Sequence, residues 1–214
     1  MKQAANTAAN SIPPAALGRL TRYLAHVQEL MRQGAEWVSS ATLARALGLT
    51  SSTVRQDLTH ITFSGISKRG YRVKGLERAL SEVLGADRSW EVVVVGAGNL
   101  GRALALHEDF TRRGIHICGI FDNDRAVVGQ RVGGLTVGGM QTLRRTVRKH
   151  GAAMGIIAVP AAAAQEVADA LVAAGVKGLL NLTLTHIATP PGVPVIDSRI
   201  AAGLQELSHA IRNA

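Results

Sequence analysis

Aromatic residues and cysteine are scarce in this sequence. Aromatic side chains make up 3% of the 214 residues, so a buried core has to be built from aliphatic side chains, which suits helices packed closely on a parallel sheet. The single cysteine, Cys118, excludes an internal disulfide and is consistent with a reducing compartment. Because Cys118 lies within an apolar run, we interpret it as a buried strand residue, with a redox-active thiol as the alternative.

Long apolar stretches and export signals are also missing. No stretch of about 18 apolar residues occurs, and no basic segment precedes an apolar one near residue 1. We therefore expect a cytoplasmic protein without a membrane span. Residues 1–10 are small and polar and are expected to form a disordered tail. The hydrophobic content of 47% is ample for a folded core in the rest of the chain.

The motifs of common catalytic and metal sites are absent as well. There is no G-x-S-x-G, H-E-x-x-H or C-x-x-C segment and no cluster of paired carboxylates. The seven histidines are scattered, and no two have the spacing of metal ligands. His107 is a candidate proton donor, but a partly exposed polar residue is the more common role of such a histidine. No segment is left for a separate substrate domain, so the sequence predicts neither an enzyme nor a metal site.

Positive charge is concentrated toward the beginning of the chain. The formal net charge is +9. Residues 1–88 contain 12 Lys/Arg and 6 Asp/Glu, a net charge of +6, whereas residues 89–214 contain 12 and 9, a net charge of +3. This excess favours nucleic acid or another anionic surface as a partner. A basic surface that serves only solubility is the alternative.

The first part of the chain has a helical pattern of short elements. Apolar residues recur at intervals of three and four after Pro13–Pro14, and Gly34 and Gly48 punctuate the pattern. Ser39, Ser40 and the segment Thr50–Ser52 are suitable N-caps for two compact helices. The predicted elements are a helix from Leu17 to Met31, a short strand at Val38, helices over residues 41–47 and 53–61, a basic turn and strand over residues 68–73, and a helix over residues 75–84.

Two short helices joined by a glycine turn, with polar residues on the second, predict a helix-turn-helix. The basic segment that follows is typical of a wing, so we expect a winged-helix DNA-binding domain over residues 11–85. A small helical bundle without DNA contacts is the alternative. Arg55 on the second helix and Lys68–Arg69 on the wing favour DNA, because both lie where phosphates and groove edges are met. The candidate DNA-binding residues are Ser51, Ser52, Thr53, Arg55, Gln56, Lys68 and Arg69.

From Glu91 onward, strands alternate with helices. The fully apolar run Val92–Val95 is typical of a parallel strand that is buried on both faces. Alternation of this kind predicts a doubly wound parallel α/β domain, here over residues 89–197. The predicted strands cover residues 92–95, 115–121, 155–159, 178–182 and 193–196, and the predicted helices cover residues 102–110, 140–150 and 161–174.

A glycine motif follows the first of these strands. Gly96 permits a tight turn, Gly98 allows the backbone to approach a pyrophosphate, and Gly101 allows close packing of helix and strand. Asp122 ends the second strand, where its carboxylate would accept hydrogen bonds from ribose hydroxyls and disfavour a 2′-phosphate. The motif therefore predicts NAD(H) as a ligand, and a glycine turn that serves only packing is the alternative. The candidate cofactor-binding residues from this motif are Gly96, Ala97, Gly98, Asn99, Leu100, Gly101 and Asp122.

With both halves considered together, residues 11–212 resemble the Rex family of redox-sensing transcriptional repressors. The resemblance implies a homodimer that represses under NAD⁺ and leaves double-stranded operator DNA when NADH binds, so that NAD(H) is a regulatory ligand. It also implies that Val159 and Pro160 belong to the cofactor site. The matching segments are Ile12–Pro13 with Arg19–Leu20, Val38–Ser40, Val54–Arg55 with Asp57–Leu58, Lys68–Gly70, Val95–Gly101, Phe121–Asp122 with Asp124, Val159–Pro160 with residues 163–165, and Ala174–Gly178.

The sequence departs from the family pattern at several positions. Gln56 replaces a lysine of the recognition helix, and Tyr71 follows Gly70 directly in a shorter wing. At the nicotinamide end, His107 aligns with a tyrosine, Arg199 with an aspartate, and residues 181–184 with a different turn. We therefore expect adenosine and pyrophosphate recognition as in the family and an altered discrimination between NADH and NAD⁺, and another nucleotide effector stays open.

The C-terminal segment, residues 198–214, is predicted to be a helix with one apolar stripe formed by Ile200, Leu204, Leu207 and Ile211. Such a stripe can fold back on its own sheet, whereas the resemblance implies that this helix is exchanged between subunits of a dimer. Overall, the sequence predicts a nucleotide-responsive repressor. The alternative is a Rossmann enzyme or subunit, either an NAD-dependent reductase or a CoA-binding domain.

Overall fold

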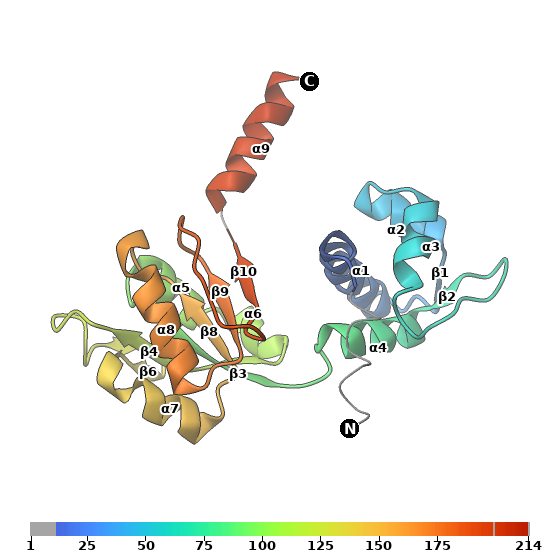
Figure 1. The fold of residues 1–214 in the computed structure, drawn as a ribbon. Coiled ribbons are helices and arrows are strands. Elements are labelled where there is room, and N and C mark those ends of the chain that lie inside the picture. Colours follow the sequence, from blue (N-terminus) through green and yellow to red (C-terminus); the bar gives the residue numbers. More distant parts are fainter. Residues whose placement is uncertain (1–11, 199, 214) are drawn as a thin grey trace, which may run out of the picture. The chain divides into compact units, whose positions relative to one another are not determined.

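The computed structural model describes residues 12–198 and 200–213, which form two compact units (Figure 1). The first unit ends at Arg88 and the second begins at Ser89. The predicted tail over residues 1–10 and the side chain of Arg199 lie outside the described residues. Each unit contains one of the two tryptophans of the chain, Trp37 in the first and Trp90 in the second.

The first unit consists of helices α1 (Pro14–Arg32), α2 (Ser40–Leu47), α3 (Ser51–Leu58) and α4 (Val73–Leu84) and strands β1 (Trp37–Val38) and β2 (Tyr71–Arg72). The hydroxyl of Ser39 accepts a hydrogen bond from the Thr42 backbone N–H at 3.0 Å, which caps α2. Thr50 caps α3 in the same way through the Thr53 backbone N–H at 3.1 Å. The helix predicted over residues 53–61 therefore begins earlier than expected, because the cap at Thr50 starts it at Ser51, and it ends at Leu58.

The core of the first unit is aliphatic apart from one tyrosine. Its fully buried side chains include Leu20 and Tyr23 of α1, Val54 of α3, and Leu76 and Leu80 of α4. Strands β1 and β2 pair antiparallel, with Val38 opposite Tyr71. The first unit is therefore a bundle of four helices around one core, with a helix-turn-helix formed by α2 and α3 and a small two-stranded sheet.

The second unit contains a six-stranded parallel sheet. Its strands are β3 (Trp90–Val95), β4 (Ile115–Asp122), β7 (Gly138–Gly139), β8 (Met154–Ile157), β9 (Gly178–Asn181) and β10 (Val195–Asp197). Their order across the sheet is β10-β9-β8-β3-β4-β7, and every neighbouring pair is parallel. This is the order of a doubly wound dinucleotide-binding sheet, in which the chain reverses direction across the sheet next to β3.

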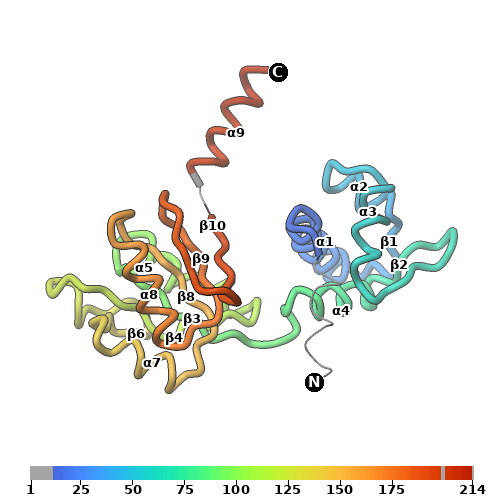
Figure 2. The backbone as a smooth tube through the Cα atoms, in the orientation of Figure 1, coloured from blue at the N-terminus to red at the C-terminus, as the bar shows by residue number. Residues whose placement is uncertain are grey.

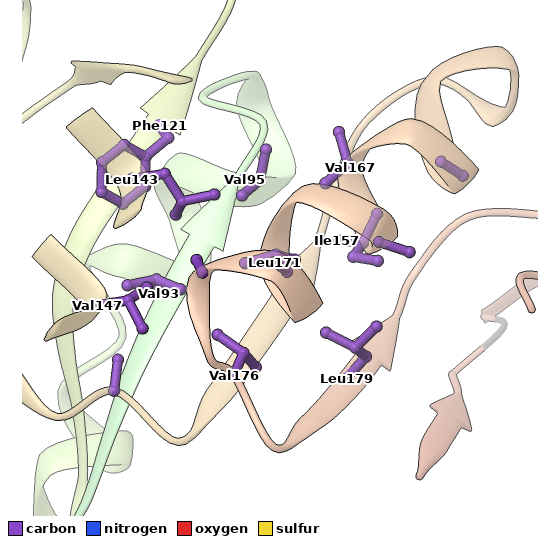
Figure 3. Close-up of a cluster of buried hydrophobic side chains, with 14 of the residues drawn as sticks. Val93, Val95, Phe121, Leu143, Val147, Ile157, Val167, Leu171, Val176 and Leu179 are labelled. Carbon is purple, nitrogen blue, oxygen red and sulfur yellow. The ribbon is translucent and has the colours of Figure 1, made fainter. Parts of the chain in front are cut away.

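Two apolar layers cover the sheet. Val93 and Val95 face the helices of one layer, and Figure 3 shows their side chains packed among Leu143, Val147 and other residues of this core. Val92 and Val94 face the opposite layer.

The elements outside the main sheet are α5 (Asn99–Ala105), α6 (Glu108–Arg112), β5 (Arg131–Val132), β6 (Leu135–Thr136), η1 (Met140–Thr142), α7 (Leu143–His150), η2 (Ala161–Ala163), α8 (Ala164–Ala174) and α9 (Ile200–Arg212).

Two features of the second unit differ from the sequence prediction. The helix predicted over residues 102–110 is broken, because His107 has an extended backbone conformation and begins a separate helix, α6. The antiparallel hairpin β5–β6 was not predicted.

The connection from β9 to β10, residues 182–194, contains no helix and runs as an irregular loop that can be followed in Figure 2. Within residues 12–198 and 200–213, no helix has the length and apolar character needed to cross a membrane.

Candidate DNA-binding and dinucleotide-binding sites

The recognition helix α3 is fixed to α1 by a partly buried ionic contact. Arg19 donates two hydrogen bonds to the Asp57 carboxylate, from Nε to Oδ2 and from Nη2 to Oδ1, both at 2.7 Å. The Tyr23 hydroxyl donates a third hydrogen bond to Oδ2 at 2.7 Å. Asp57 is 2% exposed, and such a bidentate pair fixes orientation as well as distance. Sequence reasoning noted Arg19 and Asp57 separately and missed their contact.

These contacts change the pKa values of the partners. Hydrogen bonding from the Arg19 guanidinium lowers the pKa of Asp57 below its ordinary value, against the effect of burial, and the Tyr23 hydroxyl adds to the lowering. Burial is the main reason that the pKa of Tyr23 is raised, and its hydrogen bond to Asp57 adds to the effect. Asp57 is therefore ionised and Tyr23 protonated at neutral pH, which is the state in which all three hydrogen bonds form.

The outer face of α3 carries the predicted contact residues. Arg55 and Gln56 are exposed, and Arg55 Nη1 donates a hydrogen bond to Ser40 Oγ at 3.3 Å. Ser52 is exposed, whereas Ser51 and Thr53 are half-buried. The hydroxyl of Thr50 lies 2.8 Å from both Ser52 Oγ and Thr53 Oγ1. The first turn of α3 is thus a linked group of hydroxyls next to an exposed guanidinium.

The wing is a tight turn between Ile66 and Gly70. The Ile66 N–H donates to Gly70 O at 2.7 Å, and the Gly70 N–H donates to Ile66 O at 2.9 Å. Lys68, within this turn, has a left-handed backbone with a φ of 63°. The guanidinium of Arg69 lies over the Trp37 ring at 4.1 Å from the ring centroid, a cation–π contact that orients this side chain.

A hollow of about 360 Å³ connects the recognition helix with the wing. Arg55 lines it from α3, and Lys68 and Arg69 line it from the wing. The described lining also includes three serine residues, Ser39, Ser40 and Ser67, and contains no carboxylate. Three cations with hydroxyl donors around one hollow suit a phosphate or the edge of a base. The structure therefore brings together the basic residues that the sequence pointed to separately.

The glycine loop of the second unit follows β3 and is held between the neighbouring strands. The Gly96 N–H donates a hydrogen bond to Phe121 O at 2.8 Å, and Gly96 has a φ of 104°. A Cβ atom at Gly96 would overlap the backbone of Ala158, and one at Gly101 would overlap the Gly96 carbonyl oxygen. Gly96 and Gly101 are therefore required by the packing of the loop against the sheet and α5.

Gly98 differs from the other two glycines of the motif. Its backbone is extended, with a φ of −72°, and a Cβ atom there would meet no atom within 4 Å. Packing inside the chain therefore gives no reason for a glycine at this position. The open space is what the approach of a pyrophosphate to the backbone requires. The cofactor implied by the motif thus fits the loop.

Asp122, at the end of β4, contacts the glycine loop. Its Oδ2 accepts a hydrogen bond from the Ala97 backbone N–H at 2.7 Å, and its Oδ1 accepts one from the Asp124 N–H at 2.9 Å. A carboxylate offers about four acceptor positions, so these two bonds leave room for ribose hydroxyls. The predicted acidic residue and the predicted loop are therefore joined directly.

A cavity of about 440 Å³ lies beside Asp122. Its lining includes Asn123, Arg125, Met140 and Gln141, which were not among the candidate residues. Polar groups next to the Asp122 carboxylate would suit the adenosine of a dinucleotide. Of this set, only the position of Asn123 directly after Asp122 could have been identified from the sequence.

Arg102 of α5 was also missed, although it supports the loop. Its Nε donates to Ala97 O at 2.6 Å, and its Nη2 donates to Gln130 Oε1 at 2.6 Å. The other predicted residues surround the loop. Asn99 and Leu100 begin α5 and are exposed, and Val159 lies near the position that a Gly96 Cβ would occupy, followed by the exposed Pro160.

The described residues of the second unit that depart from the Rex sequence pattern contact neighbours within that unit. His107 is exposed and stacks on Phe110, with the ring centroids 5.0 Å apart. Asn181 is buried and donates hydrogen bonds to Thr185 O and to Asp197 Oδ1, both at 2.8 Å. Its Oδ1 accepts a hydrogen bond from the Thr183 hydroxyl at 2.7 Å. Leu182 is half-buried and Leu184 exposed, whereas Arg199 lies outside the described residues.

Comparison with known proteins gives matches to both units. The family model described as "Putative DNA-binding protein N-terminus" matches residues 11–59, and the model "CoA binding domain" matches residues 87–185. The chain is 42% identical over 201 residues to the redox-sensing transcriptional repressor Rex of Carboxydothermus hydrogenoformans, covering 94% of this chain and 97% of that protein. It is 41% identical to repressor Rex 1 of Thermotoga maritima, covering 95% and 97% of the two chains.

Solved structures show the same architecture over nearly the whole chain. The structure of RSP in complex with NAD⁺ and operator DNA has a TM-score of 0.89 at 30% identity, covering 95% of this chain and 94% of that one. RSP in complex with NADH has a TM-score of 0.85 at 30% identity, covering 94% and 95%. A further structure of RSP, described as a Rex-family repressor, has a TM-score of 0.87 at 29% identity, covering 95% of each chain.

Proposed function

The chain belongs to the Rex family of redox-sensing transcriptional repressors, and we propose that it binds operator DNA through α3 and the wing and leaves it when NADH binds the glycine loop. The observation that carries the DNA-binding half is the hollow lined by Arg55, Lys68 and Arg69. Cations from two separate elements around one hollow can contact a groove and its flanking phosphates together.

The nucleotide half of the proposal rests on the open space at Gly98 and on the Asp122–Ala97 hydrogen bond. Backbone N–H groups of residues 97–101 would bind the pyrophosphate, and Asp122 would accept hydrogen bonds from the adenosine ribose. Asn99, Leu100, Val159 and Pro160 would complete the contact surface. NAD(H) is a regulatory ligand in this scheme, so the site binds it without a reaction.

We further propose that the protein is a homodimer and acts in the cytoplasm, where it reaches the chromosome. Leu204, Leu207 and Ile211 of α9 have exposed fractions between 55% and 68%, and a second subunit would cover this stripe. The side chain of Ile200, the fourth member of the stripe, is not among those described. Exchange of α9 between subunits would carry the nucleotide signal to the partner's DNA-binding unit.

Removal of residues 198–214 tests the assembly. The truncated protein should sediment as a monomer at micromolar concentration, bind NADH as the full chain does, and lose specific DNA binding. A truncated protein that is still dimeric would contradict the proposed role of α9.

A selection experiment tests the function as a whole. Full-length protein is incubated with fragments of its own genome and excess NAD⁺, bound fragments are recovered, and NADH is then added to elute them. We expect enrichment of a two-fold symmetric site, since a dimer presents two recognition helices, and elution by NADH. Recovery of fragments without a common site would contradict the proposal. CoA serves as the control nucleotide, because a family model for CoA binding also matches this unit.

A further inference from the structure

Three potential metal ligands meet at the opposite end of the sheet from the glycine loop. They are Glu91 of β3, Cys118 of β4 and His150, the last residue of α7. One carboxylate oxygen, the thiol sulfur and one imidazole nitrogen all lie within 4.8 Å of one another. The three residues are far apart in the sequence and come from three elements, so their convergence is a feature of the fold.

A bulge in the sheet turns Cys118 toward this point. Val92 pairs with Ile117, whereas Val93 pairs with Gly119, so Cys118 is an extra residue in the pairing of β3 with β4. Cys118 consequently packs with the apolar core on the α7 and α8 face of the sheet. Bulges re-aim side chains, and they occur preferentially next to functional sites.

Two of the three groups line a cavity that a small ion can enter. Cys118 and His150 line a cavity of about 610 Å³ between β4, the β6–β7 segment and α7. Glu91 and Cys118 are half-buried and His150 is exposed. Arg145 and Lys149 also line the cavity, so a cation there must be held by anionic ligands.

We propose that Glu91, Cys118 and His150 bind a divalent cation that prefers sulfur and nitrogen ligands, such as Zn²⁺. Sulfur, imidazole nitrogen and carboxylate oxygen are the three donor types that Zn²⁺ takes in proteins. In a tetrahedral site, the donor atoms are about 3.5 Å apart, given bond lengths of about 2.0–2.3 Å. The present separations of up to 4.8 Å would have to shorten toward that value on binding, and three protein ligands would leave one position for water.

Charge balance agrees with this assignment. A thiolate, a carboxylate and a neutral imidazole carry two negative charges, which a divalent cation neutralises next to Arg145 and Lys149. Binding would form a metal–sulfur bond in place of the S–H bond and release that proton to solvent.

The site is separate from the dinucleotide site. Glu91 lies at the second residue of β3, whereas Gly96 follows the end of that strand, a distance of about 16 Å along the strand. A cation at Glu91 would connect β3, β4 and α7 on one side of the sheet, without contact with the pyrophosphate-binding backbone.

Titration of the full-length protein with Co²⁺ tests the proposal, because Co²⁺ bound to a thiolate gives a charge-transfer absorption band. We expect about one Co²⁺ per chain, with this band, and its displacement by Zn²⁺. Cys118→Ser should abolish the band. His150→Ala and Glu91→Gln should each weaken affinity by about tenfold or more, because changes in groups that merely support a metal ligand already cost that much.

His186→Ala and Glu166→Gln, which change residues outside the cluster in the same unit, are the matched controls and should bind Co²⁺ as the parent does. Alkylation of Cys118 in the unchanged protein gives a readout that does not depend on a variant's folding, and saturating Zn²⁺ should slow it. The proposal is wrong if the unchanged protein shows no thiolate band, if Zn²⁺ leaves alkylation unaffected, or if His150→Ala and His186→Ala bind equally well.

Discussion

The two units fix their binding elements in different ways, and two aspartates show the difference. In the first unit, Asp57 is buried and joins α3 to α1 through side-chain contacts with Arg19 and Tyr23. In the second unit, Asp122 lies at the end of a strand and accepts hydrogen bonds from the backbone N–H groups of Ala97 and Asp124. The first arrangement is a clamp of side chains between two helices, and the second joins the end of a strand to the backbone of a loop.

This difference suits the two roles. DNA recognition needs α3 in one fixed orientation, since a small rotation displaces every base contact. The glycine loop needs free backbone surface and a carboxylate with acceptor positions to spare, since a ligand has to be taken up and released. We therefore expect changes at Asp57 to act on the stability of the first unit, and changes at Asp122 to act on ligand affinity.

The largest effect is expected from a contrast between two glycines of the same loop. Gly101→Ala places a Cβ on the Gly96 carbonyl oxygen, and relieving that overlap should lower the free energy of unfolding of the second unit by about 3 kcal/mol or more. Gly98→Ala meets open space and should leave stability within about 0.5 kcal/mol of the parent, while NADH affinity falls. Urea unfolding followed by Trp90 fluorescence in a Trp37→Phe background measures the stability of both variants, and calorimetry measures their NADH affinity. Equal destabilisation by the two substitutions would contradict the separate roles of these glycines.

Asp57→Ala should lower the stability of the first unit by about 3 kcal/mol, because it leaves Arg19 and Tyr23 without their buried partner. Trp37 fluorescence in a Trp90→Phe background reports this unfolding. Glu29→Gln is the control, since it removes an ion pair with Arg32 that is exposed on both sides, and such a pair contributes at most about 1 kcal/mol. If both substitutions lower the free energy of unfolding by the same amount, the contacts of Asp57 stabilise the unit no more than a surface ion pair does.

The clamp also predicts a pH dependence. The pKa of Asp57 is lower in the folded protein than in the unfolded chain, so its stabilisation is complete above the unfolded value of about 4. It is lost as the pH falls from there through the lowered folded value. The difference in stability between the parent and Asp57→Ala should therefore shrink below about pH 4. A constant difference over that range would mean that the carboxylate charge has no part in the clamp.

At the DNA surface, Arg55→Ala and Lys68→Ala should each weaken operator binding by about 1–3 kcal/mol. Loss of a phosphate contact should also reduce the slope of log affinity against log salt by about one for each cation removed. Fluorescence anisotropy at several salt concentrations measures both quantities. Arg32→Ala, at an exposed end of α1, is the matched control. Unchanged binding in both surface variants would exclude the winged-helix interface.

The smallest effect is expected at Asp122. Asp122→Asn keeps the size of the side chain but removes its charge, so NADH affinity should fall by about tenfold, or 1.4 kcal/mol. Discrimination against NADPH should decrease at the same time, because a 2′-phosphate no longer meets a negative charge. Calorimetry with both dinucleotides measures this, and Asp169→Asn on α8 is the control. An unchanged preference would assign nucleotide selection to other residues, such as Arg125 of the adjoining cavity.

Regular patterns in the sequence predicted most of the fold. The apolar spacing in α1, the caps at Ser39 and Thr50 and the run Val92–Val95 depend on neighbours within a few positions, so they can be interpreted locally. The break at His107 was missed because an extended residue between two short helices leaves the apolar pattern nearly intact. The hairpin β5–β6 was missed because its strands are only two residues long.

The candidate sites could be predicted only where their residues lie in short segments of the sequence. The glycine loop is one contiguous segment, and Arg55 and Lys68–Arg69 each lie within a short motif of their own, and the family resemblance indicated the function of all three segments. The contact of Arg19 with Asp57 depends on how α1 crosses α3, which no local pattern encodes. The convergence of Glu91, Cys118 and His150 depends on a one-residue bulge between two strands, and a shift of one position would turn Cys118 to the other face.

Redox-dependent repression is tested most directly by the affinity of the full-length protein for its selected operator duplex, measured by fluorescence anisotropy at one salt concentration with saturating NADH and again with saturating NAD⁺. NADH should weaken DNA binding by at least about tenfold relative to NAD⁺, a coupling free energy of about 1.4 kcal/mol. The Gly98→Val variant, in which a side chain fills the open space of the loop, should show the same affinity under both conditions. Equal operator affinity of the unchanged protein with NADH and with NAD⁺ would contradict redox-dependent repression by this chain.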